Sequence, residues 1–588
     1  MKYAAAMMMT AVMAATTVGC TTDDALNDLF EGGGGIAGGT QTGGSSATTG
    51  ELTSFTVSID KTTAEPTEAA DAYYPEAEDD FSQNSFGTEV VIDLSNPVSK
   101  TENGVAITAN GGHITADHGS TKGICYVVSG TTANGSLTIL GEKKYEVMLN
   151  GVTITNPDSA ALNLLSKKRA YIVLAEGTTN KLTDGQTSAN DHKGAFYGKG
   201  KLLFSGKGAL EVYGNYNNAI HSADYIVFGT GSNIYAKSTA NHGIKANDGI
   251  YINGGILNVE VSAAAAKGIN SESHIQVNGG RTTVITTGNG TYDTDEQEAK
   301  GSAGIKADST FTINGGELWL MSTGSGGKGL KADMDADFNG GSVYIITEGS
   351  QYSSNRDTAS PKGIKVDGNL NIKGGTIWVR TSGTNGEGIE SKSTLNISGG
   401  ETAVYAYDDA INSSSTMTIT DGYVYAQGQH NDGLDANGNL YVKGGTVYAV
   451  CSGSPEVAID ANTEGGYKLY VTGGTIVAVG GLESGSSLSQ SCYQASSWSS
   501  NTWYALSDGS STLSFKTPTS GGSGLVVSTA SSPTLLSGVS VAGGTPLFGG
   551  IANTGSTVSG GSTVSLSTYT GGAMGGMGGG GGGRPGWW

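Results

Sequence analysis

The stretch GIKADSTFTINGGELWLM, residues 304–321, decides the fold. Side chains alternate between the two sides of a β-strand, so Ile305 and Lys306 should point in opposite directions, the apolar one inward. Phe311 begins a second inward set, and Leu318 continues the pattern after a Gly-Gly turn, where glycine accepts positive φ without steric cost. The stretch therefore predicts three short strands around one apolar interior.

The same phrase recurs along the chain at a nearly fixed interval. Copies begin at Ala219, Gly243, Gly268, Gly304, Gly329, Gly363, Gly388, Ala410, Gly433 and Ala458. Most neighbours are 22 to 25 residues apart, and two gaps are 36 and 34 residues long. A period of this size indicates a solenoid, and three strands in about 24 residues make one coil of an all-β parallel β-helix. We expect roughly fifteen coils stacked over about 70 Å.

Composition supports an exported β-protein and argues against one class of partner. The chain has 96 glycines and only 10 prolines, which suits short strands joined by tight turns. Its net charge of −21 makes nucleic acid an unsuitable partner, because phosphate backbones are held by clustered Lys and Arg. An acidic balance fits a secreted protein or one that binds calcium through carboxylates. We expect a monomer.

The chain divides into six segments by composition. We predict a lipoprotein signal peptide at 1–20, a flexible Gly/Ser/Thr tether at 21–50 and an N-terminal β cap at 51–105. The β-helix should occupy 106–480, a β-rich cap region 481–570, and a disordered Gly/Met-rich tail 571–588.

The N-terminus predicts export and lipid anchoring. A short apolar run ends in Thr17-Val18-Gly19-Cys20, which resembles a bacterial lipobox, although Thr17 stands where Leu is usual. Acylation of Cys20 would hold the protein at the cell outer membrane. Asp23 and Asp24 resemble a surface-export signal, which would place the body on the extracellular side. An ordinary cleaved signal peptide is the alternative.

The three other cysteines fit no metal knuckle. Cys451 and Cys492 could form a disulfide in an exported protein, whereas three unpaired thiols, Cys125 included, is the simpler interpretation.

Aligning the copies places one polar column on the outside of the coils. Its members are His221, Lys245, Asn270, Lys306, Lys331, Lys365, Glu390, Asn412, Asp435 and Asp460. The basic half has aspartates two residues further on, so ladders of Lys and Asp that merely neutralise one another are favoured there over ligand binding.

The acidic half of this column predicts a calcium site. Carboxylates gather at one corner of four successive coils, and they would repel one another without a cation among them. Oxygen ligands without His or Cys select Ca²⁺ over Zn²⁺. A solvated acidic edge is the alternative. The candidate ligands are Glu387, Glu390, Asp408, Asp409, Asp432, Asp435, Glu456 and Asp460.

A second column lies three residues after each Gly-Gly turn and is rich in aromatic side chains. Exposed aromatic rings in a row would stack on the C–H faces of sugar rings and form a platform for a linear polysaccharide. Rings that only stabilise neighbouring coils are the alternative. The candidate carbohydrate-binding residues are Trp319, Tyr344, Trp378, Tyr425 and Tyr448. The two long gaps insert loops, TYDTDEQEAKGSA and GSQYSSNRDTASPK, that could wall one side of a groove.

Several phrases resemble a known family. LNGVTITNPDSAALNL, LAEGTTNKLTDG, GNYNNAIHSADYIV, NHGIKANDGIYINGG and NDGLDANGNLYVKGGTVYAV occur in order, and together with the Gly/Met-rich C-terminus they resemble the bacterial carbohydrate-binding domain-containing cell-surface proteins. The resemblance, over about residues 90–480 and the tail, implies a right-handed, pectate-lyase-like parallel β-helix that binds calcium and polysaccharide such as polygalacturonate or cellulose. It implies an acidic site at Asp432 and Asp435, with Asp409 and Asp460 at matching places. Lysines in the early coils imply fewer calcium ions than an acidic pattern would.

Three functions follow as hypotheses. The first is non-catalytic, surface-anchored binding of an acidic plant-type polysaccharide with structural calcium. The second is a pectate-type lyase, which needs calcium and a basic residue to abstract a proton; Lys392 and Arg380 are the basic residues near the acidic corner. The third is a surface adhesin or rod that binds another protein.

Overall fold

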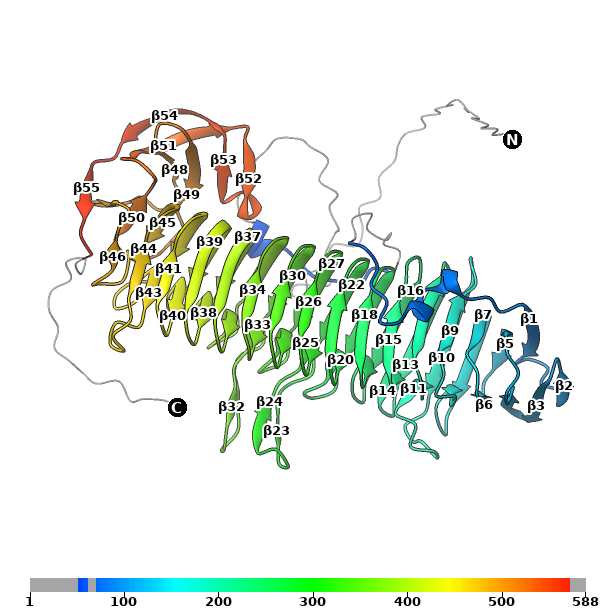
Figure 1. The fold of residues 1–588 in the computed structure, drawn as a ribbon. Coiled ribbons are helices and arrows are strands. Elements are labelled where there is room, and N and C mark those ends of the chain that lie inside the picture. Colours follow the sequence, from blue (N-terminus) through cyan, green and yellow to red (C-terminus); the bar gives the residue numbers. More distant parts are fainter. Residues whose placement is uncertain (1–50, 62–69, 572–588) are drawn as a thin grey trace, which may run out of the picture.

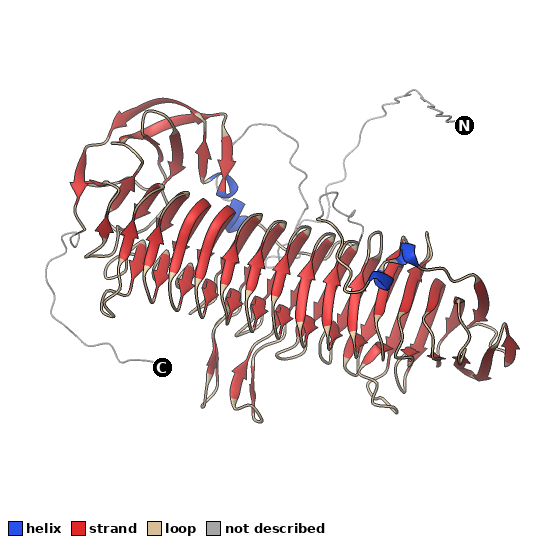
Figure 2. Ribbon diagram, in the orientation of Figure 1, coloured by secondary structure: helices blue, strands red, loops and turns tan. Residues whose placement is uncertain are grey.

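The computed structural model describes residues 51–61 and 70–571 and consists almost entirely of β-strands (Figures 1 and 2). The signal peptide, Cys20, the tether and residues 572–588 of the predicted tail lie outside the described residues. The body is a right-handed parallel β-helix of about fifteen turns with three faces, as predicted. Each turn contributes one strand to each face.

The first face is the parallel part of a 16-stranded sheet, which β2 (Lys100–Glu102) and β3 (Val105–Asn110) extend in antiparallel fashion at one end. Its parallel strands are β4 (Gly112–Asp117), β6 (Gly135–Leu140), β8 (Leu162–Leu164), β11 (Gly194–Gly198), β14 (Asn218–Ser222), β17 (Ile244–Ala246), β20 (Lys267–Ser271), β25 (Ala303–Ala307), β28 (Lys328–Ala332), β33 (Lys362–Val366), β36 (Glu387–Ser391), β38 (Ile411–Ser413), β40 (Leu434–Ala436) and β43 (Ile459–Ala461).

The second and third faces belong to one 29-stranded sheet, because the long strands β7 (Tyr145–Asn156), β37 (Leu395–Ala406) and β39 (Met417–Gly428) run through both. The second face contains β9 (Ala170–Leu174), β12 (Leu202–Gly206), β15 (Tyr225–Phe228), β18 (Gly249–Ile252), β21 (His274–Val277), β26 (Phe311–Ile313), β29 (Ala336–Phe338), β34 (Leu370–Ile372), β41 (Leu440–Val442), β44 (Leu469–Val471) and β46 (Ser487–Leu488). The third face contains β10 (Thr179–Asp184), β13 (Ala209–Gly214), β16 (Asn233–Ser238), β19 (Ile256–Val261), β22 (Arg281–Thr286), β27 (Glu317–Ser322), β30 (Ser342–Thr347), β35 (Thr376–Thr381), β42 (Thr446–Val450) and β45 (Thr475–Val479). β1 (Thr88–Asp93) and β5 (Ile124–Thr132) begin the sheet.

The inward side chains form one continuous apolar core along the axis. In β27 buried and half-buried residues alternate, as the sequence pattern predicts. The glycine that opens the phrase is required by space: a Cβ on Gly329 would lie 2.2 Å from Ile345 Cγ2 and 2.6 Å from the Gly363 carbonyl oxygen. Gly316, at the Gly-Gly turn, has a φ of 80°, which favours glycine.

Residues 51–87 differ from the predicted N-terminal β cap. They contain no strand in the described part and form a strap along the side of the β-helix, with α1 (Glu51–Ser54), η1 (Ala77–Asp79) and η2 (Phe81–Gln83). The strap begins beside β37, where Leu52 is buried, and runs back towards β1. Lys61 pairs with Glu211 at 2.8 Å, and Asp79 accepts a hydrogen bond from Arg169 Nε at 2.7 Å. These contacts explain the difference, because they bury polar and apolar strap residues against outward positions of the coils.

The C-terminal region is β-rich and has two parts. β47 (Cys492–Ala495), β50 (Leu525–Ser528) and β55 (Leu566–Tyr569) join the large sheet, and β50 runs antiparallel along the last strand of the third face, β45. The other part is a six-stranded antiparallel sheet with a short helix, which lies over the third face (Figure 1). Its elements are β48 (Trp503–Ser507), β49 (Thr512–Lys516), β51 (Thr534–Ala542), β52 (Thr545–Leu547), η3 (Phe548–Gly550), β53 (Ala552–Thr554) and β54 (Thr557–Thr563).

The two long insertions form antiparallel hairpins that project from the body (Figure 1). The first consists of β23 (Thr291–Asp293) and β24 (Glu298–Lys300), the second of β31 (Tyr352–Ser353) and β32 (Thr358–Ala359). The backbone N–H of Ala299 donates to Asp357 Oδ2 at 2.8 Å, so the hairpins are joined to each other.

Candidate functional site

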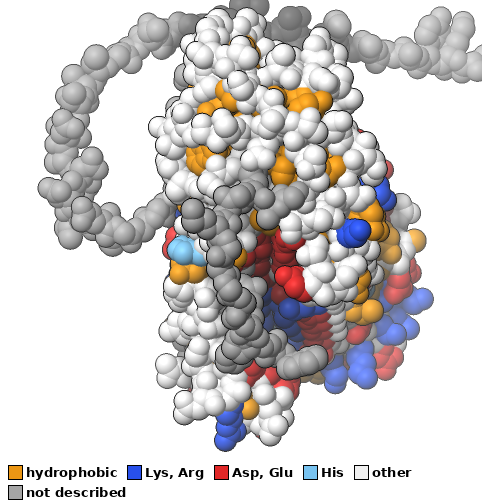
Figure 3. Space-filling model, turned by 90° about the vertical axis from the view of Figure 1, so that its left-hand side faces the viewer, with side chains coloured by type: hydrophobic (Ala, Val, Ile, Leu, Met, Phe, Trp, Pro, Cys, Tyr) orange, Lys and Arg blue, Asp and Glu red, His pale blue; other side chains and the backbone are white. Residues whose placement is uncertain are grey.

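The polar column on the first face is in register from His221 to Asp460. Each member is the direct cross-strand partner of the next, for example Lys331 with Lys365, Lys365 with Glu390, and Asp435 with Asp460. The change from basic to acidic residues along the sequence is therefore also a change along the axis of the β-helix. Seen from the C-terminal end, acidic and basic side chains gather together in a hollow below the C-terminal sheet (Figure 3).

The basic half of the column forms the predicted Lys and Asp ladder. Lys306 Nζ lies 3.0 Å from Asp333, and Lys331 Nζ lies 2.9 Å from Asp333 and 3.6 Å from Asp367. Lys365 pairs with Asp367 at 3.3 Å. Each lysine thus has a carboxylate on its own or the next coil, which offsets the repulsion along the stack.

Two of the predicted calcium ligands, Glu387 and Glu390, form ion pairs with lysines. Lys362 Nζ lies 2.7 Å from Glu387 Oε2 and 3.0 Å from Glu390 Oε1, and Lys392 Nζ lies 2.5 Å from Glu390. Burial opposes the shift, but the two lysines hold the pKa of Glu390 below its ordinary value. Lysines therefore already pair with both carboxylates in this structure, and the role of Glu387 and Glu390 as metal ligands stays a prediction.

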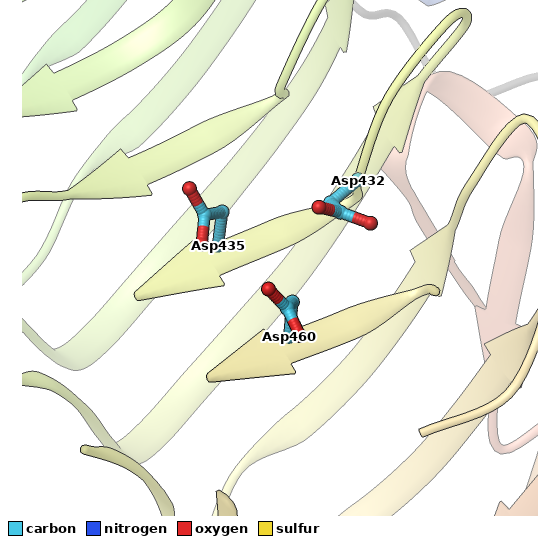
Figure 4. Close-up of side chains that lie close together, drawn as sticks. All are labelled: Asp432, Asp435 and Asp460. Carbon is cyan, nitrogen blue, oxygen red and sulfur yellow. The ribbon is translucent and has the colours of Figure 1, made fainter. Parts of the chain in front are cut away.

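The candidate cation site is formed by Asp432, Asp435 and Asp460. Asp435 lies on β40, Asp460 on β43, and Asp432 just before β40, and one carboxylate oxygen of each lies within 4.8 Å of the others (Figure 4). Asn412, one coil earlier, donates from Nδ2 to Asp435 at 2.9 Å. The backbone N–H of Val457 donates to Asp432 at 2.8 Å. Groups on the neighbouring coils therefore hold the carboxylates of Asp435 and Asp432 in place.

Crowding in a poorly hydrated corner disfavours charge on these carboxylates. Burial, with repulsion from Glu456 and Asp435, raises the pKa of Asp432 to about 8. Burial, a hydrogen bond with Glu483 and repulsion from Asp432 raise the pKa of Asp460 to about 9. A divalent cation would reverse these shifts, because it stabilises the ionised form of each ligand.

The remaining predicted ligands surround this cluster without joining it. Asp409 is buried one coil earlier and accepts a hydrogen bond from the Asp432 N–H at 3.0 Å. Its pKa is raised well above the ordinary value by burial and by repulsion from Asp435 and Asp432. Asp408 and Glu456 are half-buried, and their carboxylates lie outside the group of three. All these donors are oxygen atoms, the type that Ca²⁺ prefers.

The aromatic column is also in register, on the third face. Trp319 pairs with Tyr344, and Tyr344 with Trp378. The rings of Trp319 and Tyr344 stack with centroids 3.9 Å apart. All three residues are half-buried, and Phe55 of the strap lies with its ring 6.3 Å from that of Tyr344 and 6.2 Å from that of Trp378.

Tyr425 and Tyr448 do not face solvent, which corrects the expectation of an exposed platform. They are 3% and 0% exposed, because the C-terminal sheet covers them. Tyr448 donates its hydroxyl proton to the Lys516 carbonyl at 2.9 Å, and Phe548 lies 5.7 Å from Tyr425 between ring centroids. Burial of two large rings against this sheet therefore accounts for their place in the column.

Two aromatic stacks escaped the sequence reasoning. Tyr441 and Tyr470 stack at 4.8 Å on the second face, and both are half-buried. The rings of Tyr407 and His430 stack with centroids 4.0 Å apart at the acidic edge. In the sequence these residues directly precede Asp408 and Asn431. The paired phrases NLYVKGG and KLYVTGG contain the signal for the first stack, since the tyrosines occupy the same place in successive copies.

The two basic residues considered for catalysis are poorly suited to it. Lys392 is paired with Glu390, as described above. Arg380 lies on β35 of the third face, 3.7 Å from Glu348 and 5.5 Å from the Phe55 ring centroid. It therefore does not share a face with the acidic cluster.

Cys125, Cys451 and Cys492 are buried free thiols, which agrees with the simpler interpretation and leaves no disulfide among them. None of the helices in residues 51–61 and 70–571 combines the length and apolar character needed to cross a membrane.

Comparison with known proteins gives a family match over the β-helix. The model of the family described as "Carbohydrate-binding domain-containing protein" matches residues 101–265, 258–326, 320–386 and 380–522. A protein of that description from Acetivibrio thermocellus is 32% identical over 126 residues, which are 20% of this chain and 44% of the relative. The match thus spans less than half of the relative's length.

Among solved structures, the chain is similar to the polysaccharide lyase-like protein from C. thermocellum, determined as a gadolinium derivative. The sequences are 22% identical, the alignment covers 53% of this chain and 96% of that one, and the TM-score is 0.30. A TM-score this low gives no basis for an argument about function.

Proposed function

The chain belongs to the family of carbohydrate-binding domain-containing proteins, and we propose that it binds an acidic polysaccharide such as polygalacturonate without cleaving it. The family match across residues 101–522 carries this proposal, because it covers every coil of the polar first face. A linear polymer fits a face on which equivalent positions repeat about every 4.8 Å along the axis.

Calcium at the acidic corner would connect the protein to such a polymer. Asp432, Asp435 and Asp460 would supply three oxygen ligands, fewer than the six to eight that Ca²⁺ takes, so sites remain for water or for sugar carboxylates. The raised pKa of Asp432, which burial causes together with repulsion from neighbouring carboxylates, supports this assignment, because a bound cation would relieve both effects.

Sugar rings would stack on aromatic residues beside the acidic corner. The Tyr407–His430 stack at this edge and the Tyr441–Tyr470 stack on the second face offer ring surfaces for C–H contacts. Trp319, Tyr344 and Trp378 remain candidates on the third face, where Phe55 covers part of their surface.

Anchoring through an acylated Cys20 would place a monomeric protein on the outer face of the outer membrane. The lipobox-like sequence before Cys20 supports this part of the proposal. Fractionation of cells that express wild-type protein and the Cys20→Ala variant tests it: the variant should move from the membrane to the soluble fraction, and an unchanged distribution would reject the lipid anchor.

Affinity electrophoresis in gels that contain polygalacturonate tests the binding itself. We expect retardation that decreases in chelator, and a similar decrease for Asp435→Asn combined with Asp460→Asn. Glu176→Gln is the matched control, since this exposed carboxylate lies far along the axis with only a 4.0 Å contact to Lys207. Equal mobility with and without polymer would reject the function, and a chelator-independent melting temperature would reject the calcium site.

The same preparation separates binding from lyase activity. Incubation with polygalacturonate should give no increase in ultraviolet absorbance from unsaturated product. An increase that needs calcium would establish the lyase instead, and capture of a protein but of no glycan would favour the adhesin.

A further inference from the structure

A small cavity lies where the two hairpins meet the first face. Its volume is about 200 Å³, and it opens between β28, β33 and β36 on one side and β24 and β32 on the other. Four of the lining side chains are lysines and one is a glutamate. The lining residues are Lys328, Lys362, Lys365, Lys392, Glu390, Ala299 and residues 358–360.

The charges around this cavity do not balance. Lys362 and Lys392 pair with Glu387 and Glu390, and Lys365 pairs with Asp367. Lys328 is different: it is only 9% exposed, and its Nζ donates to the Gly326 carbonyl at 3.1 Å. Within residues 51–61 and 70–571, no carboxylate lies within 4.0 Å of this ammonium group.

A buried ammonium without a counter-charge is costly. Burial, together with repulsion from Lys365, Lys267 and Lys331, lowers the pKa of Lys328 to about 7. An anion in the cavity would offset both causes, because it replaces lost hydration and neutralises the surrounding lysines. The free protein is therefore prepared for a negative ligand at this position.

The hairpins give the cavity a defined wall. The Ala299–Asp357 hydrogen bond joins them, and Gln351 donates to the Ser360 hydroxyl at 3.0 Å. Thr358 and Ser360 line the cavity together with the lysines and offer backbone and hydroxyl groups. The two longest insertions of the repeat thus converge on this lysine-lined cavity.

We propose that this cavity binds a carboxylate of the acidic polysaccharide, with Lys328, Lys365 and Lys392 as its cationic partners. The inference rests on the proposed function and assigns it a second contact point. β33 is three strands from β40, so the cavity and the acidic cluster lie about 14 Å apart along the same face. One polysaccharide molecule could thus contact the lysines of the cavity and a calcium ion at the acidic cluster.

Isothermal titration of the full chain with an oligogalacturonate and with its carboxyl-reduced, neutral form tests the proposal. Lys328→Met should weaken binding of the acidic form about ten-fold while leaving the melting temperature unchanged or higher, since the buried charge is removed. Lys392→Gln, at a half-exposed position, should weaken binding of the acidic form several-fold. This variant provides the test if Lys328→Met fails to fold. Lys373→Met on the second face, paired with Asp337, is the matched control.

The losses of affinity in Lys328→Met and Lys392→Gln should persist when a chelator is present. This persistence separates the lysine cavity from the calcium site. Unchanged affinity of Lys328→Met and Lys392→Gln would overturn the cavity assignment while the proposed function stands. Equal binding of the acidic and the neutral forms would overturn the cavity assignment and also the preference for an acidic polysaccharide. Absence of any glycan binding by the wild type would overturn both. Equal affinity for galacturonate monomer and oligomer would assign the cavity to a free acid and overturn the polymer contact.

Discussion

Replacing Tyr448 by alanine tests whether the C-terminal half of the aromatic column is an interface. Tyr448 is fully buried, its ring meets Phe515 at 5.5 Å between centroids, and its hydroxyl donates to Lys516. Truncation of a buried aromatic ring costs about 3–5 kcal/mol, and loss of a hydrogen bond adds about 1 kcal/mol. The cost should fall on the docking of the C-terminal sheet, because Tyr448 joins that sheet to the third face.

Hydrogen exchange followed by mass spectrometry measures this cost locally. In Tyr448→Ala, amides of β48 and β49 should exchange at least a hundred-fold faster, while coils near β20 keep their protection. Tyr423→Ala on the neighbouring strand β39, where the side chain is 38% exposed, is the matched control and should change exchange little. Retardation by polygalacturonate should survive in Tyr448→Ala. Unchanged exchange together with lost retardation would refute the interface and restore Tyr448 as a sugar contact.

Three further substitutions probe charges that the fold buries. Lys362→Met should lower the free energy of unfolding by about 3 kcal/mol in chemical denaturation, because Glu387 and part of the charge of Glu390 lose their partner. His221→Gln should flatten the decline in stability between pH 7 and pH 5. Burial and Lys245 lower the pKa of His221 to about 4, so below pH 6.5 the unfolded chain binds a proton that the folded protein does not. The free energy of unfolding of the wild type should therefore fall by on the order of 1–2 kcal/mol over this range. Asp79→Asn should release the strap and speed proteolysis within residues 70–87 about ten-fold, since a charge-assisted hydrogen bond to Arg169 is lost.

Each of these expectations has a contrary result. Full stability of Lys362→Met would mean that the two glutamates are neutral in the folded protein. A pH profile of His221→Gln that is parallel to the wild type would mean that the imidazole titrates normally. Unchanged cleavage of the strap in Asp79→Asn would mean that apolar contacts such as that between Phe81 and Tyr171 hold it alone.

The repeat phrase was sufficient to predict the fold and the register of the columns. Strict spacing carries that information, because residues at the same place in successive copies become cross-strand partners, as Asp435 and Asp460 do. It also predicted the Lys and Asp ladder. What spacing could not predict is which outward surface another part of the chain covers, and for this reason Tyr425 and Tyr448 were expected in solvent.

The pairing of Glu387 and Glu390 with lysines was not expected from the sequence, and this has a different cause. Lys362 stands directly before the phrase that begins at Gly363, and Glu387 stands at the same place in the next copy. Reading the residue before each phrase as a further column would have placed Lys328, Lys362 and Glu387 in one row. The insertion between Gly329 and Gly363 separates Lys328 from Lys362 in the sequence, whereas Lys362 and Glu387 keep the regular spacing of 25 residues.

The antiparallel pairing of β50 with β45 has a consequence for how the molecules behave together. A parallel β-helix leaves the backbone N–H and C=O groups of its final turn unpaired, and such an edge can recruit a strand from another molecule. β50 occupies that edge on the third face with the opposite strand direction, from Leu525 to Ser528. Removal of residues 481–571 should therefore convert discrete particles into end-to-end fibrils, whose growth would depend on protein concentration.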